Sequence, residues 1–546
     1  MNATSQMNQT TNGPAEHPNQ QTIETPSPEI MEPPRHWGGI LRSIGPGLII
    51  AGSIVGSGEL IATTKTGAQA GISLLWLILF GCIIKVFVQI EIGRHTILHG
   101  ETSLKALNRV PGKLGPLNFF VWFWLLMMLS GVAQLGGIVG GVGQAAALAF
   151  PVWGDYERTI KLPTAEDVQQ LQAAEGQSAE LTAAQLETQQ RLEQAGEQGK
   201  LWYAEVAEGK TSPKFRTWDD LFWAALIAVC TSCLLWIGRY QHLQQLTTIL
   251  VVSFTVITIG NVIALQMTPQ WQISLSEIWY GLSFHLPEVT GNQRPIATAL
   301  ATFGIIGVGS AELIAYPYWC LEKGYAKSTG PYDGSEAWYS RAKGWLKVLQ
   351  FDAYLSMVVY TVATIAFFLM GVAVLHKAGL DPDNKLMVST LAEAYVPVFG
   401  TYAKLIFLIG AVAVLFSTFL VALASHARMY TDLFCVLGKL DRTNDSQVRL
   451  VVQCFGFLLP LVCLLIFGTQ VNPVSVVLLS GTMQALFLPM VGIATLFYRY
   501  RYSDARLQPG LWWDVLLITS CLAFLVTGVW SFASKWEEVM AFIQSM

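Results

Sequence analysis

Charged side chains are scarce in this chain of 546 residues, and their scarcity excludes an ordinary soluble protein. Asp, Glu, Lys and Arg make up 13% of the residues, whereas a soluble domain carries about 25%. The net charge of −4 provides no basic surface for nucleic acid. Hydrophobic residues make up 52% of the chain, in runs of about 20, the length that a helix needs to cross a membrane. We therefore expect a multi-pass protein of the cell membrane.

Motifs of enzyme chemistry are also lacking. No Ser-His-Asp order, zinc pattern or phosphate-binding loop stands out, and we expect His426 and Asp432 to serve at a cytoplasmic interface. The Cys230–Cys233 pair has metal-site spacing but no second pair beside it, so we expect small buried residues there. The sequence thus predicts no enzyme, no cofactor, and no nucleic-acid or protein partner beyond the lipid bilayer and a small-ion substrate.

About eleven apolar segments follow a polar tail. We expect residues 1–35 to be a disordered cytoplasmic tail and residues 36–546 to be the membrane domain. Residues 152–217, rich in Ala, Glu and Gln, are predicted to form a helical extracytoplasmic insertion between the third and fourth spans. The apolar segments are 41–70, 73–98, 117–150, 219–238, 243–266, 295–322, 346–375, 400–427, 450–468, 473–498 and 511–533.

Lys and Arg gather in the loops after the second, sixth, eighth and tenth segments, for example at Lys105, Lys327 and Arg442. Loops enriched in these residues face the cytoplasm. We therefore predict a cytoplasmic N-terminus and, with an odd number of spans, an extracytoplasmic C-terminus.

The first and sixth segments each contain a tetrad of the form Gly-Ser-small-Glu. These tetrads are Gly56-Ser57-Gly58-Glu59 and Gly309-Ser310-Ala311-Glu312. Glycine weakens a helix, and a charged residue at membrane depth costs about 2.5–3.5 kcal/mol on insertion scales. Interrupted helices in matching places of two halves are typical of transporters whose site lies at the bilayer midplane. Because five spans separate the two tetrad helices, we expect an inverted repeat.

Further motifs connect the chain with a known family. Several stretches keep that family's order and spacing, namely Gly67-Ala68-Gln69, Ser73-Leu74-Leu75-Trp76, Gln89, Arg94 and Gly100, with weaker matches at Phe351-Asp352, Ser417-Thr418, Leu479-Ser480 and Pro489. Through them, residues 40–500 outside the insertion resemble the natural-resistance-associated macrophage protein (Nramp) divalent-metal transporters. The resemblance implies an all-α, leucine-transporter-like fold of five plus five helices, with the first and sixth helices broken.

The tetrads depart from the pattern of this family. The family's Asp-Pro-Gly-Asn and Met-Pro-His-Asn fall on the two tetrads, so its metal-binding aspartate and methionine are both glycine here. Its asparagine becomes Glu59, and its histidine becomes Ala311. A glutamine of the tenth span falls on Gly481, and Gln484, one turn later, is a candidate for that polar role. The third span carries no charge, although many members have acidic proton-route residues there.

Two carboxylates that face one cavity would form a cation site. Glu59 and Glu312 would repel each other unless a cation lay between them. The resemblance implies that the carbonyls of Ser53 and Ile306 are further ligands. Since oxygen ligands without a thioether suit Mg²⁺, Mn²⁺ or Ca²⁺ better than iron, we predict a secondary transporter that moves such a cation by alternating access, with proton coupling left open.

The same tetrads allow a second interpretation. Gly-Ser-Gly on a broken first helix resembles the motif with which amino-acid transporters of the wider superfamily hold a carboxylate at exposed N–H groups. A symporter of amino acids or other organic solutes therefore remains an alternative, and so does a sensor or scaffold without transport.

Four other charged residues are candidates for a gating or proton network. Lys85 is expected either to pair with a tetrad glutamate or to extend to the membrane surface. Glu91 and Arg94 are three residues apart, which predicts an ion pair on one helix face. Asp352, near the start of the seventh span, belongs either to such a network or to the positive end of a helix dipole.

Overall fold

The computed structural model describes residues 30–176, 181–210, 215–237, 240–287, 294–383 and 386–545. Almost all of the regular structure in these ranges is helical. One two-stranded antiparallel ribbon occurs there, β1 (Lys113–Leu114) against β2 (Leu117–Asn118). Most of the predicted N-terminal tail, residues 1–29, lies outside the described residues.

Ten helical segments of the described residues are long and apolar enough to span a membrane. The first of them, Gly58–His99, joins parts of two predicted spans, because η1 (Gly58–Thr63), α3 (Thr64–Ala70), η2 (Gly71–Leu74) and α4 (Leu75–His99) follow one another directly. The first broken span begins before it, with α2 (Pro46–Ile54). The remaining spans are α6 (Phe119–Ala149), α11 (Trp218–Ile237), α12 (Tyr240–Leu265), α14 (Pro295–Ile305) with α15 (Ser310–Lys323), α17 (Glu336–Met370) with η3 (Gly371–His376), α20 (Ala403–Val436), α21 (Asp445–Gly468), α22 (Pro473–Arg501) and α23 (Leu511–Ser545).

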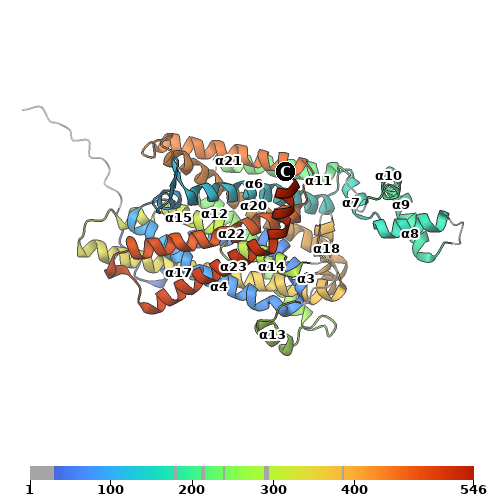
Figure 1. The fold of residues 1–546 in the computed structure, drawn as a ribbon, viewed down its shortest axis with the longest axis horizontal. Coiled ribbons are helices and arrows are strands. Elements are labelled where there is room, and N and C mark those ends of the chain that lie inside the picture. The colour runs from blue at the N-terminus through green and yellow to red at the C-terminus, as the bar shows by residue number, and fades with distance from the viewer. Residues whose placement is uncertain are drawn as a thin grey trace, which may run out of the picture.

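Short elements connect the spans. They are α1 (Trp37–Ser43), α5 (Ser103–Leu107), α13 (Leu275–Leu282), α16 (Tyr325–Thr329), α18 (Met387–Glu393), α19 (Val396–Phe399), η5 (Gly400–Tyr402) and η6 (Ala505–Leu507). The long helices form one bundle, and α8 to α10 project from one end of it (Figure 1).

The two interrupted helices lie inside the bundle. α2 contacts α15, α17 and α20, while α14 contacts α3, η1 and α22. Small residues allow such close approach: Gly481 of α22 lies against the backbone of Ala301 on α14. Apolar side chains on the outer helices, such as Leu465 and Val526, are exposed, as expected of surfaces that contact lipid. The chain is a multi-pass membrane protein.

The described residues between 152 and 217 form short helices, as their composition predicts; the side of the membrane on which they lie stays a prediction. The helices are α7 (Asp155–Ile160), α8 (Ala165–Gly176), α9 (Ala183–Gln194) and α10 (Glu197–Ala207). A separate small core holds them together, made of Val168, Leu171, Leu192, Trp202 and Val206. Asp219, at the start of α11, accepts hydrogen bonds from the N–H groups of Val152, Trp153 and Gly154, which ties the insertion to the bundle.

Candidate functional site

The first break follows α2. Val55 leaves helical geometry with φ −67° and ψ 82°, and the chain resumes as the π-helix η1 at Gly58. At Gly56, between them, the hydroxyl of Thr418 on α20 occupies the space where a side chain would begin. Only glycine fits this approach of α20 to the break.

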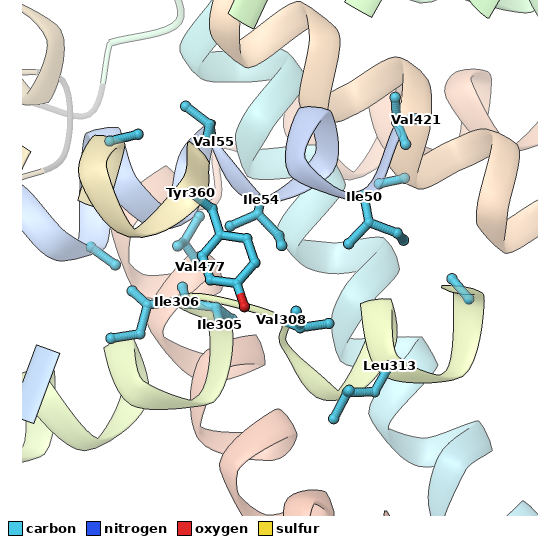
Figure 2. Close-up of a cluster of buried hydrophobic side chains, with 14 of the residues drawn as sticks. Ile50, Ile54, Val55, Ile305, Ile306, Val308, Leu313, Tyr360, Val421 and Val477 are labelled. Carbon is cyan, nitrogen blue, oxygen red and sulfur yellow. The ribbon is translucent and has the colours of Figure 1, made fainter. Parts of the chain in front are cut away.

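The second break separates α14 from α15. Ile306 is extended (φ −70°, ψ 156°), and Gly307 is left-handed (φ 59°), a conformation that favours glycine. Figure 2 shows side chains of the two breaks, including Ile54, Val55, Ile305 and Ile306, gathered near Tyr360. The prediction of broken first and sixth helices is therefore confirmed.

A cavity of about 30 Å³ lies between the two breaks, α6, α20 and α22. This volume holds about one or two water-sized species. The polar side chains on its walls come from Ser53, Ser57, Gln134, Glu312, Thr418, His426, Ser480 and Gln484. Of the predicted tetrad residues, the cavity also contacts Gly58 and Ala311. Gly56, Glu59, Gly309 and Ser310 are not among its lining residues.

Four buried polar atoms of the lining residues have no hydrogen-bond partner in the part of the chain that the structure describes. They are Glu312 Oε2, Thr418 Oγ1, Ser480 Oγ and His426 Nε2. Buried polar atoms are nearly always paired with protein, water or an ion. Their convergence on one cavity indicates a site for a polar or charged ligand.

Three oxygens converge beside Gly309, so close that a side chain at this residue would clash with them. An ideal Cβ on residue 309 would lie 2.5 Å from Glu312 Oε2, 2.7 Å from Gln484 Oε1 and 3.2 Å from the Gly304 carbonyl oxygen. The Gln484 amide oxygen is held by the N–H of Ala311, which donates to it at 3.3 Å. A carboxylate, an amide oxygen and a backbone carbonyl are the ligands that hard divalent cations prefer.

Glu59 has a different environment from Glu312. Its Oε1 accepts a hydrogen bond from Thr364 Oγ1 of α17 at 3.0 Å, and its Oε2 lies 3.4 Å from the N–H of Gly56. The sequence predicted that both glutamates face one cavity, but only Glu312 lines it. The reason is that η1, which carries Glu59, packs against α17.

Lys85 binds the carbonyl end of α14. Its Nζ donates to the carbonyl oxygens of Phe303, at 2.5 Å, and of Ile306, at 2.7 Å. The sequence predicted that Lys85 pairs with a tetrad glutamate or extends to the membrane surface. The structure shows neither, since the ammonium is fully buried and binds backbone carbonyls. A cation at a helix C-terminus stabilises the helix dipole. The Ile306 carbonyl, predicted as a metal ligand, is engaged by Lys85 in this conformation.

The other predicted network residues contact other parts of the protein and do not line the cavity. Asp352 accepts hydrogen bonds from the N–H groups of Gly45 and Gly47, at 2.9 and 2.6 Å, so it caps α2 and not its own helix. Glu91 and Arg94 form the ion pair that their spacing predicted, at 3.3 Å. Glu91 also accepts a hydrogen bond from Trp513 Nε1 at 3.0 Å, which connects the pair to α23.

Sequence reasoning missed polar residues of α20 and an ion pair between distant segments. Thr418 and His426 lie on the cavity face of α20. Their separation of eight residues, which places both on one face of a helix, is the sequence signal that could have found them. Lys65 Nζ lies 2.6 Å from Asp381 Oδ1, which holds α3 to the segment after η3. Sequence spacing alone does not bring Lys65 and Asp381 together.

The fold is similar to that of solved transporters. A mutant of the Eremococcus coleocola manganese transporter aligns with a TM-score of 0.59 and 17% identity, over 93% of this chain and 89% of that one. The same transporter in complex with an aromatic bis-isothiourea substituted compound gives a TM-score of 0.56, 17% identity and coverage of 94% and 92%. MhsT in complex with L-phenylalanine gives a TM-score of 0.50, 16% identity and coverage of 92% of this chain and 99% of that one. At these identities the similarity shows a shared leucine-transporter-like fold.

Sequence comparison identifies the family. No curated protein sequence matches the chain. The model of the natural resistance-associated macrophage protein-like family matches residues 214–534, more than half of the chain. The members of this family are transporters and not enzymes, and the predicted resemblance to this family is thereby confirmed. The chain belongs to the Nramp family.

Proposed function

We propose that this protein transports a divalent metal cation and that Glu312 is the principal ligand of that cation. The observation that carries the proposal is the unpartnered Oε2 of Glu312 in a cavity whose other polar walls are mostly oxygen. Membership in the Nramp family and the fold shared with a manganese transporter support it.

The proposed ligand set lies at the second break. Oxygens of Glu312, Gln484 and the Gly304 carbonyl converge beside Gly309. Ser53, on the first broken helix, reaches the same carboxylate, because its hydroxyl lies 3.4 Å from Glu312 Oε1. Oxygen ligands of this kind favour Mg²⁺, Mn²⁺ or Ca²⁺ over iron. In this conformation Glu59 accepts a hydrogen bond from Thr364, and the Ile306 carbonyl accepts one from Lys85.

The size of the cavity favours an ion over an organic solute. Pockets for small organic ligands usually enclose about 300–1,000 Å³, whereas this cavity encloses about 30 Å³. The observation therefore weighs against the alternative of an amino-acid symporter.

We also propose alternating access through the first broken helix, whose two halves are held at different places. Asp352 of α17 holds the N-terminus of α2, whereas Asp381 holds Lys65 of α3. We infer that α2 can move when its contact with Asp352 breaks, and that α3 can move when the ion pair of Lys65 with Asp381 breaks. We keep the predicted cytoplasmic N-terminus, and proton coupling remains open because α6 contains no charged residue.

Uptake of Mn²⁺ into proteoliposomes tests the proposal. We expect Glu312→Gln to reduce uptake at least about 100-fold, since the amide keeps the shape but loses the charge that pairs with the cation. Glu157→Gln, in the insertion, is a matched carboxylate control and should transport normally. Excess Mg²⁺ or Ca²⁺ should compete. Full Mn²⁺ uptake by Glu312→Gln, or amino-acid flux without any divalent cation, would overturn the proposal.

A further inference from the structure

We propose that His426 forms a second cation subsite in the same cavity, on the path of the transported ion. This inference rests on the proposed function and deepens it. Thr418, Ala422 and His426 lie on successive turns of α20 and all line the cavity. The facing wall runs along α6 from Met127 to Ile138, about 16 Å at 1.5 Å per residue. The lining residues therefore extend along α6 and α20, and His426 lies at a different level of α20 from Thr418.

The hydrogen bond of the imidazole fixes which nitrogen is free. His426 Nδ1 lies 2.7 Å from the carbonyl oxygen of Ala422. A carbonyl can only accept, so Nδ1 carries the proton and the Nε2 lone pair is available in the neutral ring. Nε2 has no hydrogen-bond partner among the described residues. A histidine whose second nitrogen donates to a backbone carbonyl has the arrangement of a metal ligand.

The opposite wall leaves this nitrogen accessible. A Cβ on Gly131 of α6 would lie 3.1 Å from Nε2, so glycine keeps the space in front of the imidazole open. Met127, one turn before Gly131, also lines the cavity and brings a thioether. Nitrogen and sulfur ligands suit divalent transition metals, whereas Mg²⁺ and Ca²⁺ avoid them.

The two subsites therefore differ in chemistry. Glu312 and Gln484 offer oxygen and one negative charge, whereas His426 and Met127 offer neutral nitrogen and sulfur. His426 lies eight residues from Thr418, about 12 Å along α20 at 1.5 Å per residue. A divalent transition metal can occupy both positions in turn, but Mg²⁺ is confined to the first.

Calorimetric titration of the full-length protein with Ni²⁺ tests the subsite. Cys230, Cys233 and Cys454 are free and exposed, so each is first replaced by serine to remove competing thiols. We expect two Ni²⁺ sites in this background. His426→Leu should lower the affinity of one site at least tenfold and leave Mg²⁺ binding unchanged.

A second variant tests the subsite without altering the imidazole. Gly131→Ala places a methyl group in front of Nε2 and should also weaken one Ni²⁺ site, whereas Gly260→Ala, which has open space around it, should not. Met127→Leu should weaken the same site several-fold, and Met429→Leu, buried on α20 away from the cavity, should not.

Glu312→Gln separates this inference from the proposed function. Loss of the other Ni²⁺ site in Glu312→Gln supports both proposals. If Glu312→Gln keeps both sites while His426→Leu loses one, the proposed function fails and the subsite stands. If neither His426→Leu nor Gly131→Ala changes Ni²⁺ binding, the subsite is overturned.

Discussion

The two broken helices carry nearly the same tetrad and place its glutamate in different environments. Glu59, at the first break, is held by Thr364 and lies outside the cavity lining. Glu312, at the second break, lines the cavity and keeps one carboxylate oxygen without a hydrogen-bond partner among the described residues. The comparison shows that similar motifs in two halves of an inverted repeat can differ in environment, since one glutamate is held by a neighbouring helix and the other is open to a cavity.

The same comparison explains the two glycines that replace the family's side-chain ligands. At Gly56 the space is taken by Thr418 of α20, and at Gly309 it is bordered by Gln484 of α22. In both cases an oxygen from a neighbouring helix lies where the family's own side chain would begin. Polar side chains of α20 and α22 therefore join those of the broken helices in the cavity lining.

Among changes that leave both glutamates in place, the largest expected effect comes from a side chain at residue 309. In Gly309→Ala the new methyl group meets Glu312 Oε2 and Gln484 Oε1 at 2.5 and 2.7 Å, so both oxygens must move. We expect at least about a 30-fold loss of Mn²⁺ affinity, or about 2 kcal/mol. Gly58→Ala is the matched control, because its methyl group has no neighbour closer than 3.7 Å. Equal losses in the two variants, measured by titration, would remove the distinction between the breaks.

At the first break we expect a smaller effect, which lowers stability and leaves Mn²⁺ affinity nearly unchanged. Thr364→Val removes the hydroxyl that donates to Glu59 Oε1, which should cost about 1–3 kcal/mol of stability because a buried carboxylate loses a partner. Mn²⁺ affinity should change less than twofold.

Thr361→Val is the control for this prediction, since the Thr361 hydroxyl has no hydrogen-bond partner among the described residues. Thermal unfolding and Mn²⁺ titration are measured on the same samples. A large loss of affinity in Thr364→Val would show that Glu59 also serves the ligand.

The smallest expected effect concerns a third carboxylate, Glu101, just beyond the end of α4. Burial opposes its charge, but His95, Lys105 and Arg109 lie around it and lower the pKa of Glu101 to about 2, from 4.5. As the pH falls, Glu101 therefore becomes protonated at a higher pH in the unfolded chain than in the folded protein. The stabilisation is complete above pH 4.5 and is lost as the pH falls from 4.5 towards 2.

Thermal unfolding at pH 6 and pH 3.5 measures this effect. The melting temperature of the unmodified protein should fall by a few degrees more than that of Glu101→Gln, which lacks the titrating group. Parallel decreases in both proteins would show that Glu101 is not stabilised by its basic neighbours. Glu101, with Lys105 and Arg109 as ion-pair partners, contrasts with Glu312, which accepts a hydrogen bond from the Ser53 hydroxyl.

The sequence predicts the breaks because glycine and glutamate inside an apolar run are local signals. It does not predict which glutamate faces the cavity, since that depends on how η1 packs against α17 and on the position of Thr364. The partners of Lys85 were missed for the same reason, because the carbonyls of Phe303 and Ile306 become available only where α14 ends. His426 looked isolated in the sequence because its cavity forms only when α6 and α20 come together.

The most direct test of the central claim is a crystal structure with Mn²⁺, located by its anomalous signal. We predict a peak in the cavity about 2.0–2.6 Å from Glu312 Oε2 and Gln484 Oε1, the range for hard divalent cations and oxygen. A peak at Glu59 without contact to Glu312, in a protein that transports Mn²⁺, would contradict the account.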